Sequence, residues 1–229
     1  MYHLEHDRPI VQKYGGTSVG SLERIDAVAK RVAEQYHEGF QKIAIVVSAM
    51  SGETNRLVDL VSGINPRASL RNYDMVVTAG EQVSVALMAA ALEKHGIPSR
   101  AYLGYQLGIV TDNFHSQARI QKIDCSKLYR CWEEGIIPVV AGFQGVTGDL
   151  EITTLGRGGS DTSAVALAVA LDAAFCEINT DVDGVFTADP RVVPDARLVC
   201  EMDFEVALEM ASLGSKVLHS RCVELGAKY

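Results

Sequence analysis

The sequence of 229 residues lacks the features that mark several large classes of protein. Its five cysteines form no Cys-x-x-Cys pair, and their odd number favours free thiols over a disulfide framework. The segment from Met1 to Pro9 is polar and contains no signal peptide. Every apolar run is too short or too interrupted to span a bilayer. We therefore predict a reduced, cytoplasmic protein with cysteines as packing residues and no membrane partner.

Positive charge is also scarce. The chain has 21 lysines and arginines against 29 aspartates and glutamates, which gives a formal net charge of −8. This balance argues against nucleic acid or a membrane surface as a partner, because both would require a basic field. An anionic small molecule could still bind where positive charge is concentrated locally. Lysines and arginines inside glycine-rich segments are therefore the first candidates for a binding site.

The common catalytic signatures are missing as well. The sequence has no Ser-His-Asp or Cys-His pattern, no zinc-ligand spacing, no Walker A motif and no Gly-x-Gly-x-x-Gly fingerprint. The segment that starts at Asp181 resembles the first residues of a calcium loop. Its twelfth position is Val192, where an EF-hand requires glutamate, so we reject that interpretation. We predict no metal site built from the protein's own side chains.

What the chain does contain is a steady alternation of apolar strands and amphipathic helices, without repeats, low-complexity tracts or linkers. This order predicts an α/β fold, a three-layer α/β/α sandwich with a mainly parallel central sheet, in a single domain that spans residues 1–229. The expected strands are 9–14, 42–50, 100–103, 108–111, 136–141, 149–154 and 174–180. The expected helices are 21–38, one from residue 54 or 55, 75–95, 117–134, 164–171, 204–210 and 215–225. The nearly all-apolar centre of helix 75–95 is either core or a subunit interface, so a homodimer is possible.

The segment 155–164 is the most informative part of the sequence. Three glycines surround Arg157, and Ser160 and Asp161 then lead into a helix of small apolar residues. Glycines allow a close approach of the backbone to a ligand, and a helix N-terminus attracts anions. Either Ser160 or Asp161 is the expected N-cap. The segment predicts an anion site, although a tight strand-to-helix turn with an exposed arginine would have the same sequence.

Two further glycine-rich breaks carry lysines. Lys13 lies where the first strand meets a glycine loop, and Lys216 follows Gly214 at an expected helix start. Loops at the carboxyl edge of a parallel sheet converge on one crevice, which would bring these lysines to Arg157 and Asp161. Such a site suits phosphoryl transfer, which depends on positioning and on neutralising charge. By itself, however, Lys13 would be interpreted as a solvated residue at a strand end.

Six ordered segments resemble those of aspartate kinases, which are members of the amino acid kinase family. The three most specific are 13–19, 156–164 and 180–191, and the segments 51–55, 80–81 and 214–219 match in order and spacing. The resemblance implies ATP-dependent phosphorylation of L-aspartate to 4-phospho-L-aspartate, the first step of lysine, threonine and methionine synthesis. Mg²⁺ would be carried with the ATP.

The resemblance also implies roles for individual residues. Lys13 would stabilise the transferred phosphoryl group, and Asp161 would organise the active-site lysines. Arg157 would bind the α-carboxylate of aspartate, and Glu81 would receive its ammonium group. The pocket for the amino acid would also include Thr54 and Ser160. Nucleotide binding would involve Gly15, Gly16, Ser18, Thr180, Asp181, Phe186, Arg191 and Lys216. Taken alone, Glu81 could simply complement a helix dipole.

The sequence departs from the family pattern in three places. Tyr14 and Ser220 replace a usual phenylalanine and proline, and the sequence stops at Tyr229, before a further strand and two ACT regulatory domains that the family normally has. We therefore expect a truncated catalytic domain without ACT domains. Two alternatives remain: a non-catalytic module that binds nucleotide or aspartate together with a partner chain, and a family relative that phosphorylates another carboxylate.

Overall fold

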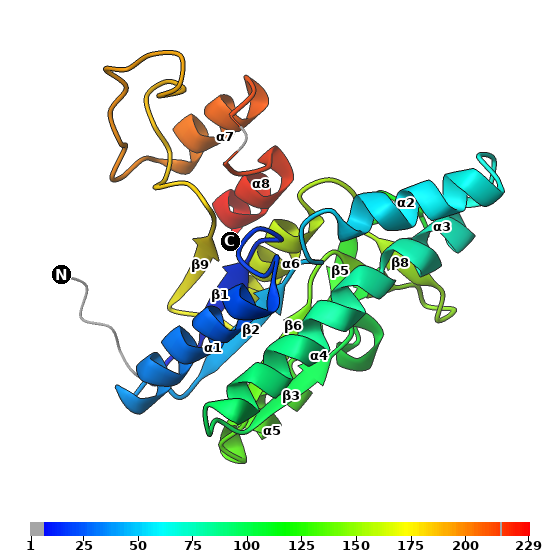
Figure 1. Cartoon of the computed structure of the whole chain (residues 1–229), viewed down its shortest axis with the longest axis horizontal. Coiled ribbons are helices and arrows are strands. Elements are labelled where there is room, and N and C mark those ends of the chain that lie inside the picture. Colours follow the sequence, from blue (N-terminus) through cyan, green and yellow to red (C-terminus); the bar gives the residue numbers. More distant parts are fainter. Residues whose placement is uncertain (1–6, 216) are drawn as a thin grey trace.

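The computed structural model describes residues 7–215 and 217–229. Its centre is a sheet of five strands in the order β3-β6-β2-β1-β9, and all of the strand pairs are parallel (Figure 1). The strands are β1 (Ile10–Tyr14), β2 (Ile43–Val47), β3 (Ser99–Tyr102), β6 (Ile137–Ala141) and β9 (Phe175–Asn179). The predicted α/β architecture with a mainly parallel central sheet is thus confirmed.

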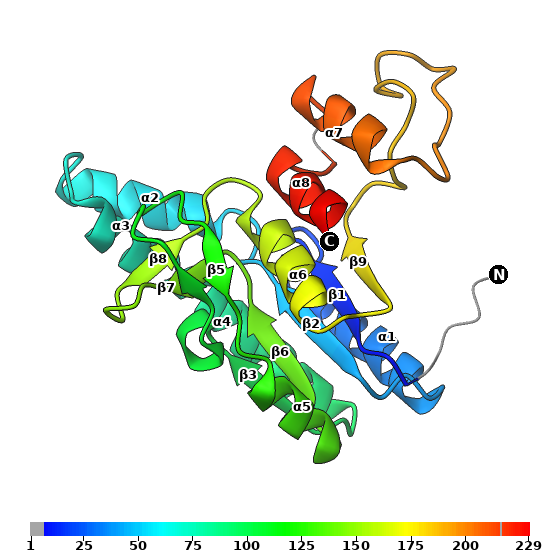
Figure 2. The same ribbon diagram turned by 180° about the vertical axis from the view of Figure 1, so that it is seen from behind.

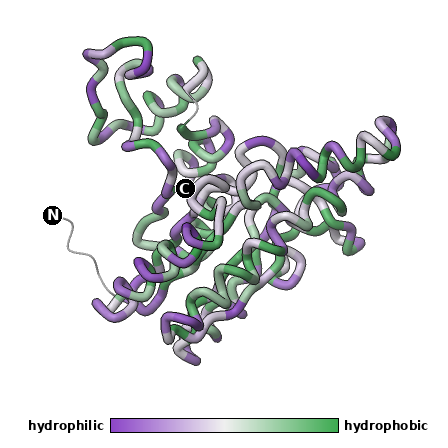
Figure 3. The backbone as a smooth tube through the Cα atoms, in the orientation of Figure 1, coloured by the Kyte–Doolittle hydropathy of each residue, from purple (hydrophilic) through white to green (hydrophobic). Residues whose placement is uncertain are grey.

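Helices cover both faces of this sheet. On one face lie α1 (Leu22–His37) and α4 (Ala79–Lys94), and on the other α5 (Ser126–Glu133) and α6 (Gly159–Ala170). Strands β1, β2 and β6 are buried at every position because helices pack on both of their faces, which explains the nearly continuous apolar sequences of β2 and β6. The alternation of polar and apolar residues along α1 is visible in Figure 3, and the apolar side of this helix faces the sheet.

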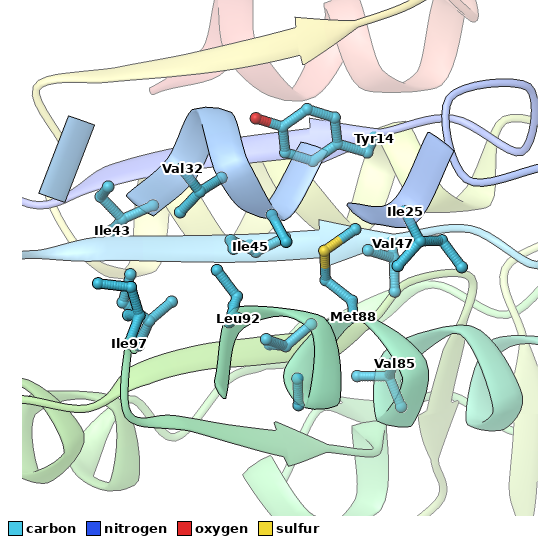
Figure 4. Packing of buried hydrophobic residues seen from close by; sticks show 14 of the residues in the cluster. Tyr14, Ile25, Val32, Ile43, Ile45, Val47, Val85, Met88, Leu92 and Ile97 are labelled. Atoms are coloured by element: carbon cyan, nitrogen blue, oxygen red, sulfur yellow. The ribbon is translucent and has the colours of Figure 1, made fainter. Parts of the chain in front are cut away.

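The side chains of each strand alternate between two cores. Ile43, Ile45 and Val47 of β2 pack against α1 and α4, together with Met88 and Leu92 (Figure 4). The intervening Ala44 and Val46 belong to the second core, under α5 and α6. Lys13 of β1 lies between Gln12 and Tyr14, so its side chain is on the same face as Val11, toward α6. The pleat of β1 therefore directs Lys13 toward the start of α6.

A smaller, mixed sheet continues from the central one. Its order is β5-β4-β7-β8, and the antiparallel β7–β8 pair confirms the hairpin predicted around residues 149–154 (Figure 2). Its strands are β4 (Val110–Thr111), β5 (Ile120–Lys122), β7 (Gln144–Val146) and β8 (Ile152–Thr154). Beside it lie α2 (Glu53–Ile64), α3 (Leu70–Val77) and the short 3₁₀ helix η1 (Gly104–Leu107).

The predicted helix 75–95 extends further back than expected. Only Thr78 separates α3 from α4, and its backbone is helical, with φ −70° and ψ −12°. The combined stretch Leu70–Lys94 is long and apolar enough to cross a membrane by length and composition alone. Half of its most apolar part is buried in the protein, and α4 packs against α1, β2, β3 and β6. This is the position of a core helix.

Two other expected helices were placed wrongly. The segment 117–134 contains β5 and only then α5, because Ala118 N–H bonds to the Thr154 carbonyl and ties the first residues to β8. The last helix, α8 (Ser220–Lys228), starts five residues later than predicted, with His219 as its N-cap. Between β9 and α8, the loop 180–203 and α7 (Phe204–Ser212) project away from the sheet, as both ribbon views show. Helix α8 packs against α6 and α7.

Candidate active site

A cavity of about 940 Å³ opens at the carboxyl ends of β1 and β2 and at the N-termini of α2, α4 and α6. This is where parallel α/β sheets bind their ligands. Seven of the predicted site residues line it: Lys13, Gly16, Thr54, Glu81, Arg157, Ser160 and Asp161. Residues far apart in the sequence thus meet in one pocket, as the resemblance implied.

Lys13 and Asp161 form the most buried ion pair of this pocket. Lys13 Nζ lies 2.6 Å from Asp161 Oδ1, and the two side chains are 11% and 14% exposed. Lys13 is the penultimate residue of β1, whereas Asp161 lies in the first turn of α6. A Cβ on Gly15 would lie 3.3 Å from Lys13 Nζ, so the glycine leaves room for the ammonium group. The pair fixes a positive charge beside a helix N-terminus.

Helix α6 begins differently from the prediction. Its N-cap is Gly158, with φ +70°, rather than Ser160 or Asp161. Gly156 has φ +76°, so the turn around Arg157 uses two backbone conformations that favour glycine. Because the N-cap is at position 158, Ser160 and Asp161 fall in the first helical turn, and both line the cavity. Arg157 is exposed at the cavity wall.

Glu81 is a buried carboxylate in the first turn of α4. Its side chain lines the cavity although the residue is only 2% exposed. Oε1 accepts a hydrogen bond of 3.1 Å from Ala49 N–H, whereas Oε2 has no partner among the described residues. Burial raises the pKa of Glu81 to about 7, against the smaller opposing effect of the Ala49 hydrogen bond. Such a group is suited to binding a cation.

The predicted nucleotide residues are more scattered. Gly15 N–H approaches the Asn179 carbonyl at 3.4 Å, which joins the first glycine loop to the end of β9. Ser18 is half-buried in that loop and does not line the cavity. Thr180, Asp181, Phe186 and Arg191 follow β9 and also lie outside the cavity lining. Lys216 lies outside the described residues.

The contacts of this second group are local. Thr180 donates to Asp181 at 3.2 Å, and exposed Arg191 pairs with Asp189 at 2.8 Å. Phe186 forms an isolated bridge with Leu198. The structure therefore brings together the residues predicted for phosphoryl transfer and for the amino acid, whereas among the described residues predicted for the nucleotide only Gly16 lines the cavity.

Several cavity residues were missed by the sequence analysis. They include Ala49, Tyr73, Ser116, Phe143 and Thr154. Ser116 and Phe143 have positive φ angles of 66° and 69°, and nothing in their residue types announces such backbone conformations. Gly142, which precedes Phe143, was the one available signal, because glycine commonly marks a turn.

The acidic groups that the structure describes are too dispersed to form a metal centre of their own. In the described part of the chain, no three His, Cys, Asp or Glu residues gather closely enough to hold a metal ion. A divalent ion in this cavity would therefore have to bring further ligands with it, and Mg²⁺ commonly does so in the form of nucleotide phosphates and water.

The fold and the site agree with the comparisons to known proteins. The sequence model of the amino acid kinase family matches residues 8–228. The chain belongs to the amino acid kinase family. An aspartate kinase from Pseudomonas putida is 56% identical over 220 residues, which are 96% of this chain and 53% of that relative. An aspartokinase from Geobacillus stearothermophilus is 53% identical over the same length. The chain spans about half the length of the curated relatives it matches.

Solved structures give the same result. Aspartate kinase from Synechocystis superposes with a TM-score of 0.84 at 50% identity, over 96% of this chain and 36% of that one. E. coli aspartokinase III in complex with aspartate and ADP has a TM-score of 0.84 at 26% identity, over 96% and 60%. An isopentenyl phosphate kinase, at 20% identity and a TM-score of 0.65, shares the fold. The similarity to aspartate kinases within the family is thereby confirmed.

Proposed function

We propose that this chain is a catalytic domain that transfers the γ-phosphoryl group of ATP to the side-chain carboxylate of L-aspartate. The observation that carries the proposal is the presence of Glu81, Arg157 and the Lys13–Asp161 pair in one cavity. The aspartate kinases at 53–56% identity support it, as does the aspartate and ADP complex of E. coli aspartokinase III.

The charges of the cavity match a zwitterionic amino acid. Arg157 offers a planar guanidinium, which suits the α-carboxylate. Glu81 Oε2 has no partner among the described residues and would accept from the α-ammonium group. Thr54 and Ser160 provide hydroxyl groups in the same lining. Recognition of both charges at the α-carbon leaves the side-chain carboxylate free to react near Lys13.

The reaction requires no proton transfer. A side-chain carboxylate oxygen attacks the γ-phosphorus, the bond from that phosphorus to the β–γ bridging oxygen breaks, and the electron pair leaves with ADP. The attacking carboxylate is already ionised at neutral pH, so a general base is unnecessary. Lys13 would neutralise charge on the transferred group, and the N-terminus of α6 would add its positive potential. Asp161 would hold the ammonium group of Lys13 in place.

The nucleotide would enter on the side of the first glycine loop. Gly15, Gly16 and Ser18 would contact its phosphates, and Thr180, Asp181, Phe186, Arg191 and Lys216 would bind the rest of it. Mg²⁺ carried with ATP would neutralise phosphate oxygens, which fits a cavity that offers few carboxylates.

The product 4-phospho-L-aspartate would serve lysine, threonine and methionine synthesis in the cytoplasm. Val83 on α4 is half exposed, so pairing of two copies through this helix is part of the proposal.

The direct test is to trap the acyl phosphate. The chain is incubated with MgATP, L-aspartate and hydroxylamine, and the hydroxamate is measured. We expect product with aspartate and little with glutamate or succinate. Absence of product at every Mg²⁺ concentration would overturn the proposal for this chain. The alternative is a non-catalytic module, and it is motivated by the match to only half the length of the relatives. Calorimetry that shows nucleotide binding without turnover, together with activity that a partner chain restores, would identify this alternative.

A paired substitution tests the role of Arg157. Arg157→Ala should raise the KM for aspartate by at least about tenfold and leave the KM for ATP nearly unchanged, because one charge-assisted contact to the amino acid is lost. The control is Arg130→Ala on α5, since Arg130 is also exposed but lies outside the cavity lining. An unchanged KM for aspartate in Arg157→Ala would reject the assigned contact.

A further inference from the structure

Asp74 is a fully buried carboxylate that lies next to the cavity without lining it. It belongs to α3, and its exposed fraction is 0%. The preceding residue, Tyr73, lines the cavity, whereas Asp74 is turned toward the loop 112–119 and strand β8. A buried ionised side chain requires partners, because burial of an unpaired charge is costly.

Four hydrogen bonds satisfy this carboxylate. Thr154 Oγ1 donates to Oδ1 at 2.7 Å, and His115 Nδ1 lies 2.8 Å from Oδ2. Ser116 N–H donates to both oxygens, at 3.1 and 3.0 Å. These donors come from two separate segments, the loop 112–119 and the end of β8. Asp74 therefore joins two segments that both continue into the cavity wall.

The two joined segments support Arg157. A Cβ on Gly156 would lie 2.8 Å from the Ser116 carbonyl oxygen, so the turn that carries Arg157 packs directly on Ser116. Ser116 has a φ of +66°, a conformation that a serine adopts only when its surroundings impose it. The bonds from its N–H to Asp74 impose it here. Ser116, Thr154, Gly156 and Arg157 all line the cavity.

The same helical stretch also carries Glu81. Asp74 is in α3 and Glu81 is in the first turn of α4, and the helical stretch Leu70–Lys94 is continuous. The stretch Leu70–Lys94 thus carries Glu81, which is proposed to receive the ammonium group. It also carries Asp74, which holds the segments beside Arg157, the residue proposed to bind the α-carboxylate. Asp74 thus connects, through its hydrogen bonds, the helical stretch that carries Glu81 with the segments beside the Arg157 turn.

We propose that Asp74 is a positioning residue that fixes Arg157 relative to Glu81 and thereby sets the affinity of the cavity for its amino acid. This inference rests on the proposed function for the identity of the substrate, but the bonds of Asp74 do not depend on it. Asp74 itself does not line the cavity. Its loss should therefore affect the amino acid specifically, and the nucleotide hardly at all.

Kinetics with three variants separates positioning from general damage. Asp74→Asn keeps the shape but replaces one acceptor with an NH₂ group that faces the donors. We expect it to raise the KM for aspartate about tenfold and the KM for ATP less than about twofold, because hydrogen bonds to a buried charged acceptor are lost. Thr154→Val removes one donor and should raise the aspartate KM by a smaller factor.

The matched control is Thr153, the residue next to Thr154. Thr153 is as buried as Thr154, at 0% exposure, but its hydroxyl bonds Thr111 at 2.7 Å on the other face of β8. Thr153→Val should therefore leave both KM values unchanged. Partial unfolding lowers the concentration of active enzyme and thus kcat, without changing one KM alone. An unchanged aspartate KM in Asp74→Asn, or equal increases in both KM values, would overturn the proposal.

Hydrogen exchange provides a measurement that does not need turnover. In Asp74→Asn, amide exchange in residues 114–118 and 155–158 should accelerate by at least about tenfold, while β1 and β2 remain protected, because only the local opening free energy changes. If the wild-type chain forms no acyl phosphate, the proposed function fails, and exchange still decides the structural claim. Unchanged exchange in both loops would show that Asp74 does not hold them.

Discussion

The backbone of Gly158 lies directly against the side chain of His219. A Cβ placed on Gly158 would be 2.4 Å from His219 Cβ and 2.6 Å from its Cγ, a distance that no real side chain tolerates. Gly158 caps α6 beside Arg157, and His219 caps α8. The absence of a side chain at one position thus allows two helix starts to meet at the edge of the cavity.

Gly158→Ala should therefore damage both stability and activity. The new methyl group collides with His219, and φ +70° is unfavourable for alanine, so we expect the unfolding free energy to fall by about 2 kcal/mol. Displacement of the Arg157 turn should also raise the KM for aspartate. Gly63→Ala is the control, because Gly63 lies in α2 with open space around it and alanine favours helix. Denaturant titrations and steady-state kinetics of both variants measure the contrast.

The Lys13–Asp161 pair should be essential for turnover. Lys13→Met and Asp161→Asn should each lower kcat by at least about 100-fold, because the charge that faces the transferred group is lost or misplaced. The control is Lys30→Met on α1, whose pair with Glu34 spans 4.0 Å and is largely exposed. It should change neither kcat nor stability measurably. Full activity in Lys13→Met would contradict the role proposed for this lysine.

The pKa of Glu81, raised by burial to about 7, predicts a dependence of stability on pH. Folding favours the protonated carboxyl, so its contribution is complete below the unfolded pKa of 4.5 and declines as the pH rises toward 7 and beyond. Glu81→Gln should resemble the wild type at pH 4 and be more stable at pH 8 by up to about 3 kcal/mol. Urea titrations across this range measure the difference. Parallel curves for the two proteins would show that Glu81 titrates normally.

The same carboxyl should control substrate binding. An ammonium group binds the ionised form, so the KM for aspartate should fall as the pH rises from 6 to 8, through the pKa of about 7. In Glu81→Gln this dependence should disappear, and the KM should be high throughout. The KM for ATP, measured over the same range, serves as the internal control. A pH dependence that survives in Glu81→Gln would have to come from another group.

Arg221 should contribute to stability through the main chain. Its guanidinium donates to the Ala118 carbonyl at 3.0 Å and also to the Leu155 carbonyl, and so holds α8 to both loops beside the cavity. Arg221→Met should lower the unfolding free energy by about 1–3 kcal/mol, because two carbonyl groups lose a charged donor. The comparison is Arg119→Met, whose side chain is exposed and outside the cavity lining. Equal unfolding free energies of the two variants would show that the hydrogen bonds of Arg221 do not contribute to stability.

The sequence predicted those parts of the site that depend on local pattern. A buried strand that ends in glycine and serine predicts a sheet edge, so the sequence alone assigns Lys13 and the segment 155–164 to one crevice. The resemblance then added Glu81, Thr54 and Ser160, all of which the structure places in the cavity lining. Local periodicity and motif spacing were sufficient here, because the carboxyl ends of parallel strands converge irrespective of loop detail.

The parts that could not be predicted depend on distant contacts. The segment 117–123 has helical periodicity but is held extended, because Ala118 N–H bonds the Thr154 carbonyl on β8. Asp74 lies just before the helix predicted at 75–95, and its importance follows from donors 41 to 80 residues away. The N-cap Gly158 packs against His219, far along the chain, and leaves no room for a side chain at this position. Such long-range contacts leave no trace in a single sequence.

The position of β1 in the sheet has a consequence for how the chain folds as it is synthesised. Strand β1 lies between β2 and β9, so Ile10 pairs with Ile43 on one side and with Phe175 on the other. The second partner emerges from the ribosome more than 160 residues after the first strand, as the Gln12–Glu177 bond illustrates with its separation of 165. Until then one edge of β1 is unsatisfied, and a nascent chain in this state is vulnerable to mispairing and aggregation. Formation of the Lys13–Asp161 pair likewise has to wait until the segment that carries Asp161 has been synthesised.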